Sequence, residues 1–197
     1  MFLPVAVSAT DYVCTLEGDG LNVIGGLGPD KWAIELQSIG AVDGTYSDVK
    51  CTFQKKLKFK DISKLSAWFN VTATDCGGGS PRFSIAIDMN GDGTFTQPTD
   101  GHVFVYFGPY PNFYDCPFGW QSTGNLIGNT DLRFDLSQVG GPWYGSYADA
   151  LALLGNKRVL YISLNVDSGW WLARFPRGQV VQFDNIWINN INVKFDP

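Results

Sequence analysis

Short stretches in which apolar and polar residues alternate one by one recur along this chain, and they constrain its fold most strongly. The alternation is clearest over residues 83–87, 103–107 and 160–166. Successive side chains of a strand point to opposite faces, so each stretch has one face suited to a core and one suited to solvent. Twenty-three glycines and ten prolines, spread between such stretches, supply the turns. The pattern predicts an all-β protein built from antiparallel strands.

Eight segments have the composition and spacing of strands. They are Tyr12–Leu16, Trp32–Gln37, Ser47–Phe59, Leu65–Ala73, Arg82–Asp88, His102–Phe107, Arg158–Val166 and Val180–Val193. The 197 residues are enough to bury one core, and no repeat or linker divides the sequence. We therefore expect a single antiparallel jelly-roll β-sandwich over residues 10–197.

One helix is expected within this β pattern, at about residues 146–155. Ser146 and Asp149 have the spacing of a capping box, with Asp in place of the usual Glu or Gln. Good helix formers follow, and Gly155 and Asn156 end the segment. The simplest position for so short a helix is across one end of the sandwich.

The four cysteines indicate two disulfides. None of them lies in a C-x-x-C motif, and the only histidine, His102, has no cysteine near it, so the spacing of a metal site is absent. Of the three possible pairings we favour Cys14–Cys51 with Cys76–Cys116. Each of these would close a loop of about 40 residues, worth roughly 4 kcal/mol in the chain-entropy model. Disulfides predict an oxidising, extracellular compartment.

Residues 1–9 form an apolar N-terminal segment with two open interpretations. It ends in a V-S-A run that a signal peptidase accepts, but it is short for a complete signal peptide and has no basic start. It is either a signal remnant or a strand of the mature chain that pairs with something else.

Charge excludes one class of partner. The formal net charge is −5, only 17% of residues are charged, and no basic stripe is present to neutralise phosphates, which argues against nucleic acid. The densest basic cluster is interpreted as a solvent-facing strand surface in preference to a binding patch; it comprises Lys55, Lys56, Lys58 and Lys60. No segment has the run of about 18 apolar residues that a membrane span needs. The chain is expected to be secreted, without a membrane span.

Four motifs resemble a group of secreted, largely uncharacterised jelly-roll proteins. The motifs are DCGGGSPRF at 75–83, V-Y-x-G-P at 105–109, TGNLI at 123–127 and a Y-A-D-A-L helix at 147–151. The resemblance spans roughly residues 60 to 190. It implies the fold and export, but no particular activity, because the group has no agreed one.

A looser resemblance lies at the two ends of the domain. Residues 17–20 (EGDG) and 183–188 (FDNIWI) are similar to the paired signatures of jelly-roll carbohydrate-binding modules of the galactose-binding-like fold. In that family the first and last strands share a structural calcium. Carried over, the resemblance implies Glu17, Asp19 and Asp184 as ligands, since calcium prefers several oxygen ligands. The alternative is a turn at Asp19 and a bulge at Asp184.

A second candidate calcium loop begins at Asp88. The run Asp88-Met-Asn90-Gly-Asp92-Gly has the D-x-N-x-D-G opening of an EF-hand loop, but Thr99 stands at the twelfth position and strands flank it. The same residues also read as a long hairpin connection, because Asn-Gly and Asp-Gly are strong turn pairs.

Aromatic residues are unusually abundant, at 15% of the chain. Flat aromatic surfaces stack on sugar rings while neighbouring polar groups fix the hydroxyls. Those expected in loops are the candidate ligand-binding residues: Tyr110, Tyr114, Trp120, Trp143, Tyr144, Trp170 and Trp171. Either they bind a partner, or they fold back over the ends of the core.

The sequence favours binding over catalysis. His102 has no nucleophile elbow beside it, and Glu17 and Glu35 are the only glutamates, although composition leaves paired carboxylates for glycoside hydrolysis open. The first hypothesis is an extracellular, non-catalytic module that binds carbohydrate or cell-surface glycan and holds structural calcium. The alternative is a structural subunit of an extracellular filament or surface layer, whose residues 1–9 donate a strand to another copy.

Overall fold

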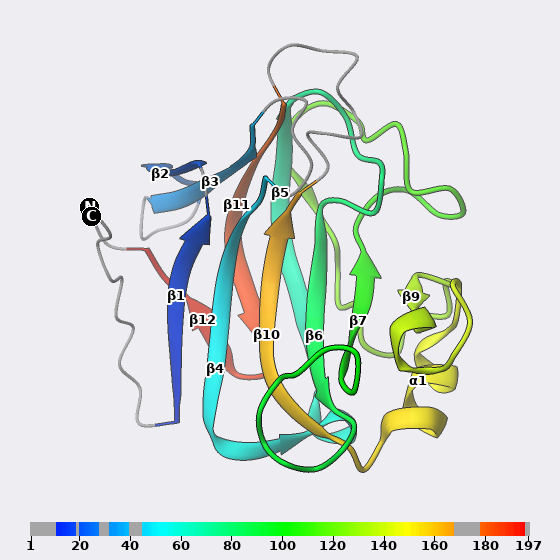
Figure 1. Cartoon of the computed structure of the whole chain (residues 1–197). Coiled ribbons are helices and arrows are strands. Elements are labelled where there is room, and N and C mark those ends of the chain that lie inside the picture. Colours follow the sequence, from blue (N-terminus) through cyan, green and yellow to red (C-terminus); the bar gives the residue numbers. More distant parts are fainter. Residues whose placement is uncertain (1–10, 19, 28–31, 40–44, 168–177, 196–197) are drawn as a thin grey trace.

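Two antiparallel β-sheets stacked face to face form the architecture of the computed structural model, which describes residues 11–18, 20–27, 32–39, 45–167 and 178–195 (Figure 1). Sheet A has the spatial order β1-β4-β10-β6-β7-β9. Sheet B has the order β2-β3-β11-β5-β8, and β12 pairs with β11. The predicted all-β sandwich is therefore confirmed.

The elements have the following bounds. The strands are β1 Tyr12–Gly18, β2 Gly20–Gly25, β3 Trp32–Ser38, β4 Ser47–Lys58, β5 Leu65–Ala73, β6 Arg82–Asp88, β7 Gly101–Tyr106, β8 Gln121–Ser122, β9 Phe134–Asp135, β10 Arg158–Val166, β11 Gln179–Ile188 and β12 Ile191–Val193. The helices are α1 Tyr147–Leu154 and two 3₁₀ turns, Phe59–Asp61 and Ser137–Val139.

The core lies between the two sheets and follows from the alternation seen in the sequence. Phe83, Ile85 and Ile87 of β6 face inward with no exposed surface, and Ile162 of β10 is equally buried. Four phenylalanine rings join the sheets at ring-centroid distances of 5.1–6.2 Å: Phe69, Phe83, Phe107 and Phe183. Burying a side chain of this size stabilises the fold by about 1.5–3 kcal/mol.

Most strands lie where the alternation predicts them, and the differences have local causes. The last predicted strand is divided into β11 and β12 because Asn189 takes a positive φ of 55° and turns the chain. The strands β2, β8 and β9 were not predicted. β8 and β9 are two residues long, and β2 has only four residues between glycines, so none has a clear period.

The predicted helix is confirmed as α1, with the predicted cap. The Ser146 side chain accepts a hydrogen bond from the Asp149 N–H at 3.2 Å, and the Asp149 carboxylate accepts one from the Ser146 N–H at 2.8 Å. The helix lies beside β9 at one side of the sandwich (Figure 1). Ala150 and Leu154 are buried, and the ring of Tyr147 stacks on Phe59.

Both preferred disulfide pairings are confirmed. Cys14–Cys51 joins directly opposed residues of β1 and β4. Cys76–Cys116 joins the loop before β6 to the long loop after β7.

Several predictions fall on residues outside the described ranges. These are the apolar segment 1–9 with its strand donation, the calcium ligand Asp19, and the aromatic pair Trp170 and Trp171. Within the described ranges, no helix has the length and apolar character needed to cross a membrane.

Removing the Cys14–Cys51 bridge should destabilise the sandwich without changing its strand order. The Cys14→Ala/Cys51→Ala variant is expected to lose about 2–4 kcal/mol of unfolding free energy, because the denatured chain regains the freedom of a long loop. Urea denaturation measures this loss. Thr52→Ala, at an exposed neighbouring position of β4, is the control and should stay within about 0.5 kcal/mol of wild type. Equal stability of the double variant and the control would contradict the expectation.

Candidate functional site

A shallow pocket of about 190 Å³ opens at the end of the sandwich where β6 begins. Segment 74–81 connects β5 to β6, segment 107–120 follows β7, and segment 140–146 precedes α1. Together they contribute nearly the whole lining: Gly77, Gly78, Gly79, Tyr106, Asn112, Phe113, Tyr114, Trp143 and Tyr144. The pocket therefore forms only when distant parts of the chain come together.

Three consecutive glycines form one wall. All have positive φ, and a β-turn closed by two backbone hydrogen bonds between Gly77 and Ser80 holds them. A Cβ atom at Gly79 would lie 3.2 Å from the ring of Tyr106. Glycine is needed here both for the backbone conformation and for the close approach of the tyrosine ring.

Two links next to Cys76 help to fasten segment 107–120 to the glycine loop at 77–79. One is the Cys76–Cys116 disulfide. The other is the carboxylate of Asp75, whose Oδ1 accepts hydrogen bonds from the N–H groups of Cys76 at 2.6 Å and Cys116 at 2.8 Å. The side chain of Gln179 in β11 donates to the Asp75 and Ser80 carbonyls, which ties the same loop to sheet B.

Phe113 is the centre of the aromatic lining. It is buried and has a positive φ of 59°, a conformation that non-glycine residues rarely adopt. Its ring stacks on Tyr144 at 6.0 Å and contacts Tyr106 at 5.2 Å and Tyr110 at 6.2 Å. Rings from two loop segments and a strand end thus support one another.

Four of the predicted ligand-binding residues meet at this site with much of their surface exposed. The exposed fraction is 67% for Trp143, 55% for Tyr144 and 41% for Tyr114, all of which line the pocket. Tyr110, at 47%, packs on Phe113 beside it. Trp120 is half-buried and does not line the pocket.

Tyr106 is a fixed part of the pocket floor. Its hydroxyl donates a hydrogen bond of 2.7 Å to the buried carboxylate of Asp135. Burial and this acceptor raise the pKa of Tyr106 well above its usual value, so the phenol stays protonated. The guanidinium of Arg133 donates to the Tyr106 carbonyl at 2.6 Å and lies over the Phe113 ring.

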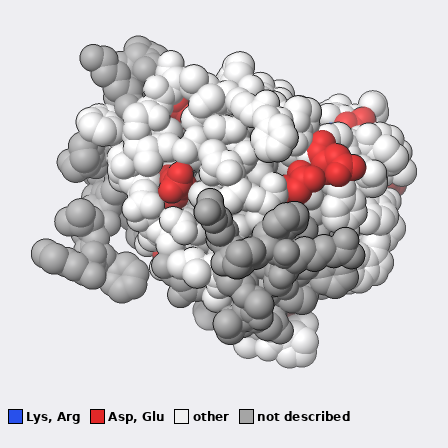
Figure 2. Space-filling view, turned by 90° about the horizontal axis from the view of Figure 1, so that it is seen from above, with Lys and Arg blue, Asp and Glu red and all other residues white. Residues whose placement is uncertain are grey.

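The pocket lining is uncharged. None of its residues is Asp, Glu, Lys, Arg or His. Figure 2 looks onto this end of the sandwich and shows Asp and Glu, but no Lys or Arg, on the surface of the described residues. An anionic ligand would meet no compensating charge there.

The structure places Glu17 and Asp184 in different sheets. Glu17 lies on the outer face of sheet A, 3.5 Å from the Lys50 ammonium. Asp184 belongs to β11 of sheet B, next to outward-facing Trp68, and accepts the Leu27 N–H at 2.6 Å. Calcium between the terminal strands stays a prediction whose third ligand, Asp19, is not described.

The loop that begins at Asp88 is held by hydrogen bonds from its own backbone and side chains to its carboxylates. The Asp88 carboxylate accepts the N–H groups of Gly91 at 2.6 Å and Gly93 at 3.0 Å, and the side chains of Asn90 and Asp92 bond to each other. This geometry agrees with the turn interpretation, and calcium at this loop stays a prediction. Among described residues, the only cluster of potential Asp, Glu, His or Cys metal ligands is Asp75, Cys76 and Cys116, and both cysteine sulfurs are in the disulfide.

A cluster of titratable groups on the outer face of sheet A was missed by the sequence reasoning. His102 Nε2 and the Tyr161 hydroxyl share a hydrogen bond of 2.8 Å, and the Phe95 ring covers both. Burial lowers the pKa of His102 to about 4 and raises the pKa of Tyr161 to about 12. The Lys50 ammonium lies 4.8 Å from the centre of the Tyr161 ring.

Asp48 is the most perturbed acid of this face. It is 6% exposed, pairs with Asn165 at 3.2 Å, and lies opposite Glu17 in the register of β4 and β1. Its Oδ1 is buried and has no hydrogen-bond partner among the described residues. Burial, followed by the charge of Glu17, raises the pKa of Asp48 to about 7. Sequence alone could not show this, because alternation marks Asp48 only as outward-facing.

Comparisons with known proteins leave the chain without a family. No protein-family model matches it, and no curated protein matches it either. A solved structure described as an exo-beta-agarase is similar at a TM-score of 0.36 and 14% sequence identity. The match covers 91% of this chain and 23% of that one. A likeness of this size identifies neither a family nor a function.

Asp48 should make the protein less stable as pH rises. Its folded pKa of about 7 lies above the ordinary 3.8, so the folded state binds the proton more tightly. The associated stability is complete below about pH 4 and is lost as pH rises towards 7, by up to about 4 kcal/mol. Asp48→Asn is expected to flatten this decline in urea denaturation at pH 4, 5.5 and 7.5. The exposed Asp115→Asn serves as control, and a decline unchanged by Asp48→Asn would refute the assignment.

Tyr106→Phe tests the floor of the pocket. It leaves the buried Asp135 oxygen without its donor and should lower the unfolding free energy by about 1–3 kcal/mol. Tyr110→Phe removes the hydroxyl of a tyrosine that is 47% exposed, and it should change stability by less than about 0.5 kcal/mol. The two values are compared by urea denaturation, and the assignment fails if they are the same.

Proposed function

We propose that this chain is an extracellular module that binds a neutral glycan at the pocket formed by Gly77–Gly79, Tyr114, Trp143 and Tyr144. The observation that carries the proposal is the convergence of exposed aromatic side chains from separate loops on one uncharged hollow. Exposing large aromatic surfaces to water is unfavourable, and it is common where a partner covers them. The two disulfides suit the oxidising surroundings of a secreted protein.

The lining supports a sugar better than other small ligands. Aromatic faces stack on the C–H groups of a sugar ring, while the Asn112 amide, the tyrosine hydroxyls and the backbone of the glycine loop provide hydrogen bonds to hydroxyl groups. A volume of about 190 Å³ is below the ~300 Å³ at which pockets for drug-sized ligands begin. The pocket therefore suits one sugar ring at the end of a chain, or a single ring of a longer one.

Absence of charge at the pocket favours binding over chemistry. A glycoside hydrolase needs two carboxyl groups on either side of the scissile bond, and no carboxylate lines this pocket. The tyrosine that forms its floor, Tyr106, keeps its proton. The same absence of charge favours neutral over acidic sugars.

Trp143→Ala is the direct test. The neutral polysaccharides to be tested are agarose, dextran, xylan, laminarin and galactomannan. The variant is expected to bind any of these that retains wild type about ten- to a hundredfold more weakly, because it lacks the most exposed ring of the pocket. Affinity electrophoresis across these neutral polysaccharides measures the change.

Phe118→Ala is the matched control. Phe118 is 94% exposed but does not line the pocket, so its loss should leave binding unchanged. The proposal is abandoned if none of the polysaccharides retains wild type, or if Trp143→Ala and Phe118→Ala weaken retention equally.

A further inference from the structure

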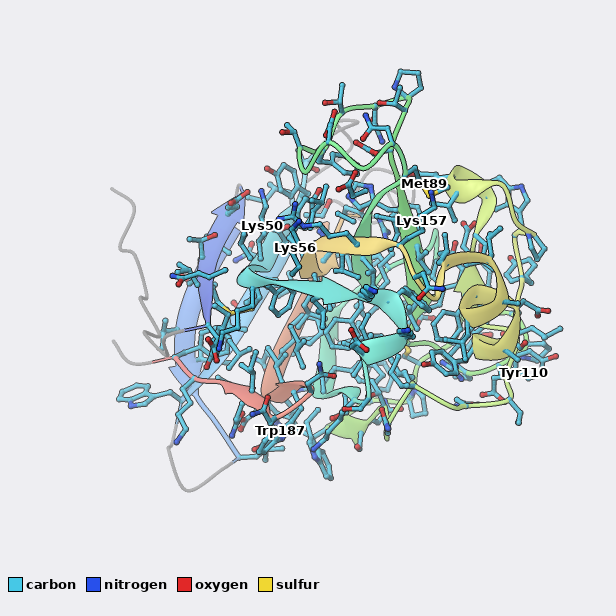
Figure 3. All side chains as sticks on the ribbon, turned by 90° about the horizontal axis from the view of Figure 1, so that it is seen from below. Lys50, Lys56, Met89, Tyr110, Lys157 and Trp187 are labelled. Atoms are coloured by element: carbon cyan, nitrogen blue, oxygen red, sulfur yellow. A yellow bond between two sulfur atoms is a disulfide. The ribbon has the colours of Figure 1, made fainter. Side chains whose placement is uncertain are left out.

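A second pocket, of about 290 Å³, lies at the opposite end of β6. The aromatic pocket adjoins the loop that leads into Arg82, whereas this one is lined by Asp88 at the far end of the strand. Its lining comes from the end of β4, the loop after β6 and the start of β10: Lys56, Asp88, Met89, Asn90, Gly91, Asn156, Lys157 and Arg158. Figure 3, seen from below, shows Lys56, Met89 and Lys157 on one side of the molecule and Tyr110 apart from them.

The lining carries an excess of positive charge. Lys56, Lys157 and Arg158 face one acid, Asp88, whose two oxygens already accept the Gly91 and Gly93 N–H groups. Among the described residues, none of the three cations has a carboxylate within ion-pair distance. Unpaired cations grouped around a hollow attract an anion even on a chain of net charge −5.

One donor atom of the Arg158 side chain has no acceptor among the described residues. Its Nε is buried without an acceptor in the described structure, and leaving such a donor unpaired is costly. A Cβ at Gly93 would lie 2.6 Å from Arg158 Nη1, so the glycine allows the guanidinium to lie against the loop. Lys157 has one partner, the Met89 carbonyl at 2.8 Å, which holds its ammonium at the pocket.

We infer that this pocket binds an oxyanion, a sulfate, phosphate or carboxylate group carried by an acidic polysaccharide. Arginine and lysine are the usual ligands of such groups, and a planar guanidinium forms two parallel hydrogen bonds with them. The site is separate from the aromatic pocket, and the inference does not depend on the glycan bound there. One module would hold a neutral sugar at one end of β6 and an acidic one at the other.

The test is binding to dextran sulfate and polygalacturonate, with uncharged dextran beside them, in 0.15 M NaCl. The Lys56→Gln/Arg158→Gln variant is expected to bind the acidic polymers at least about tenfold more weakly than wild type. Lys55→Gln/Lys60→Gln removes the same charge from exposed side chains outside the pocket and should bind nearly as wild type. Melting temperatures of both variants establish that they are folded.

Inorganic sulfate separates the two sources of the anion. If millimolar sulfate competes with the acidic polymer for the protein, the pocket also accepts a free oxyanion. If sulfate does not compete but Lys56→Gln/Arg158→Gln loses binding to the polymer, the pocket recognises the anion only as part of the polymer. The inference is overturned if wild type binds no acidic polymer and no sulfate, or if both double variants weaken binding equally. Trp143→Ala should leave binding to the acidic polymers intact. The result of this test is therefore independent of whether the pocket lined by Trp143 binds a neutral glycan.

Discussion

The period of two along β6 and β10 is the constraint on which the rest of the structure depends. These strands are neighbours in the middle of sheet A, and their inward residues, such as Ile85 and Ile162, supply the buried centre of the core. A slip of one residue would exchange every inward side chain for an outward one. The same register determines which polar side chains are neighbours on the outer face of sheet A. Tyr161 of β10 pairs with Ala86 of β6, and Ala86 in turn pairs with His102 of β7.

The fold was largely predictable because its signals are local. Alternation marked the bounds of β5, β6 and β10 to the residue, and the Ser146–Asp149 cap marked the start of α1. The short β8 and β9 could not be predicted, because two-residue strands are defined by their neighbours and not by their own sequence. Both disulfides were reached from loop length, which is also a property of the chain alone.

The sites were predictable only in part, because they depend on strand order. Loop position grouped Tyr114, Trp143 and Tyr144 as candidates, and the structure places them in the lining of one pocket. It did not point to Phe113, whose role comes from the rings it contacts. The resemblance that linked Glu17 with Asp184 assumed neighbouring terminal strands, whereas β1 and β11 belong to different sheets. The pocket lined by Lys56, Lys157 and Arg158 joins three segments that are distant in sequence, whereas the sequence alone favoured a solvent-facing surface for the lysine-rich cluster at 55–60.

The two disulfides differ in what else holds together the segments that they join. Cys14–Cys51 joins strands that are already paired through their backbones. Cys76–Cys116 joins two loops that, among the described residues, are also linked by hydrogen bonds from the Cys116 N–H to Asp75 and from the Phe107 N–H to the Pro81 carbonyl. In a reducing compartment segments 74–81 and 107–120 would lose their covalent link, whereas β1 and β4 would keep their backbone pairing. The glycan binding that we propose at the pocket between these loops would then depend on the Cys76–Cys116 bond.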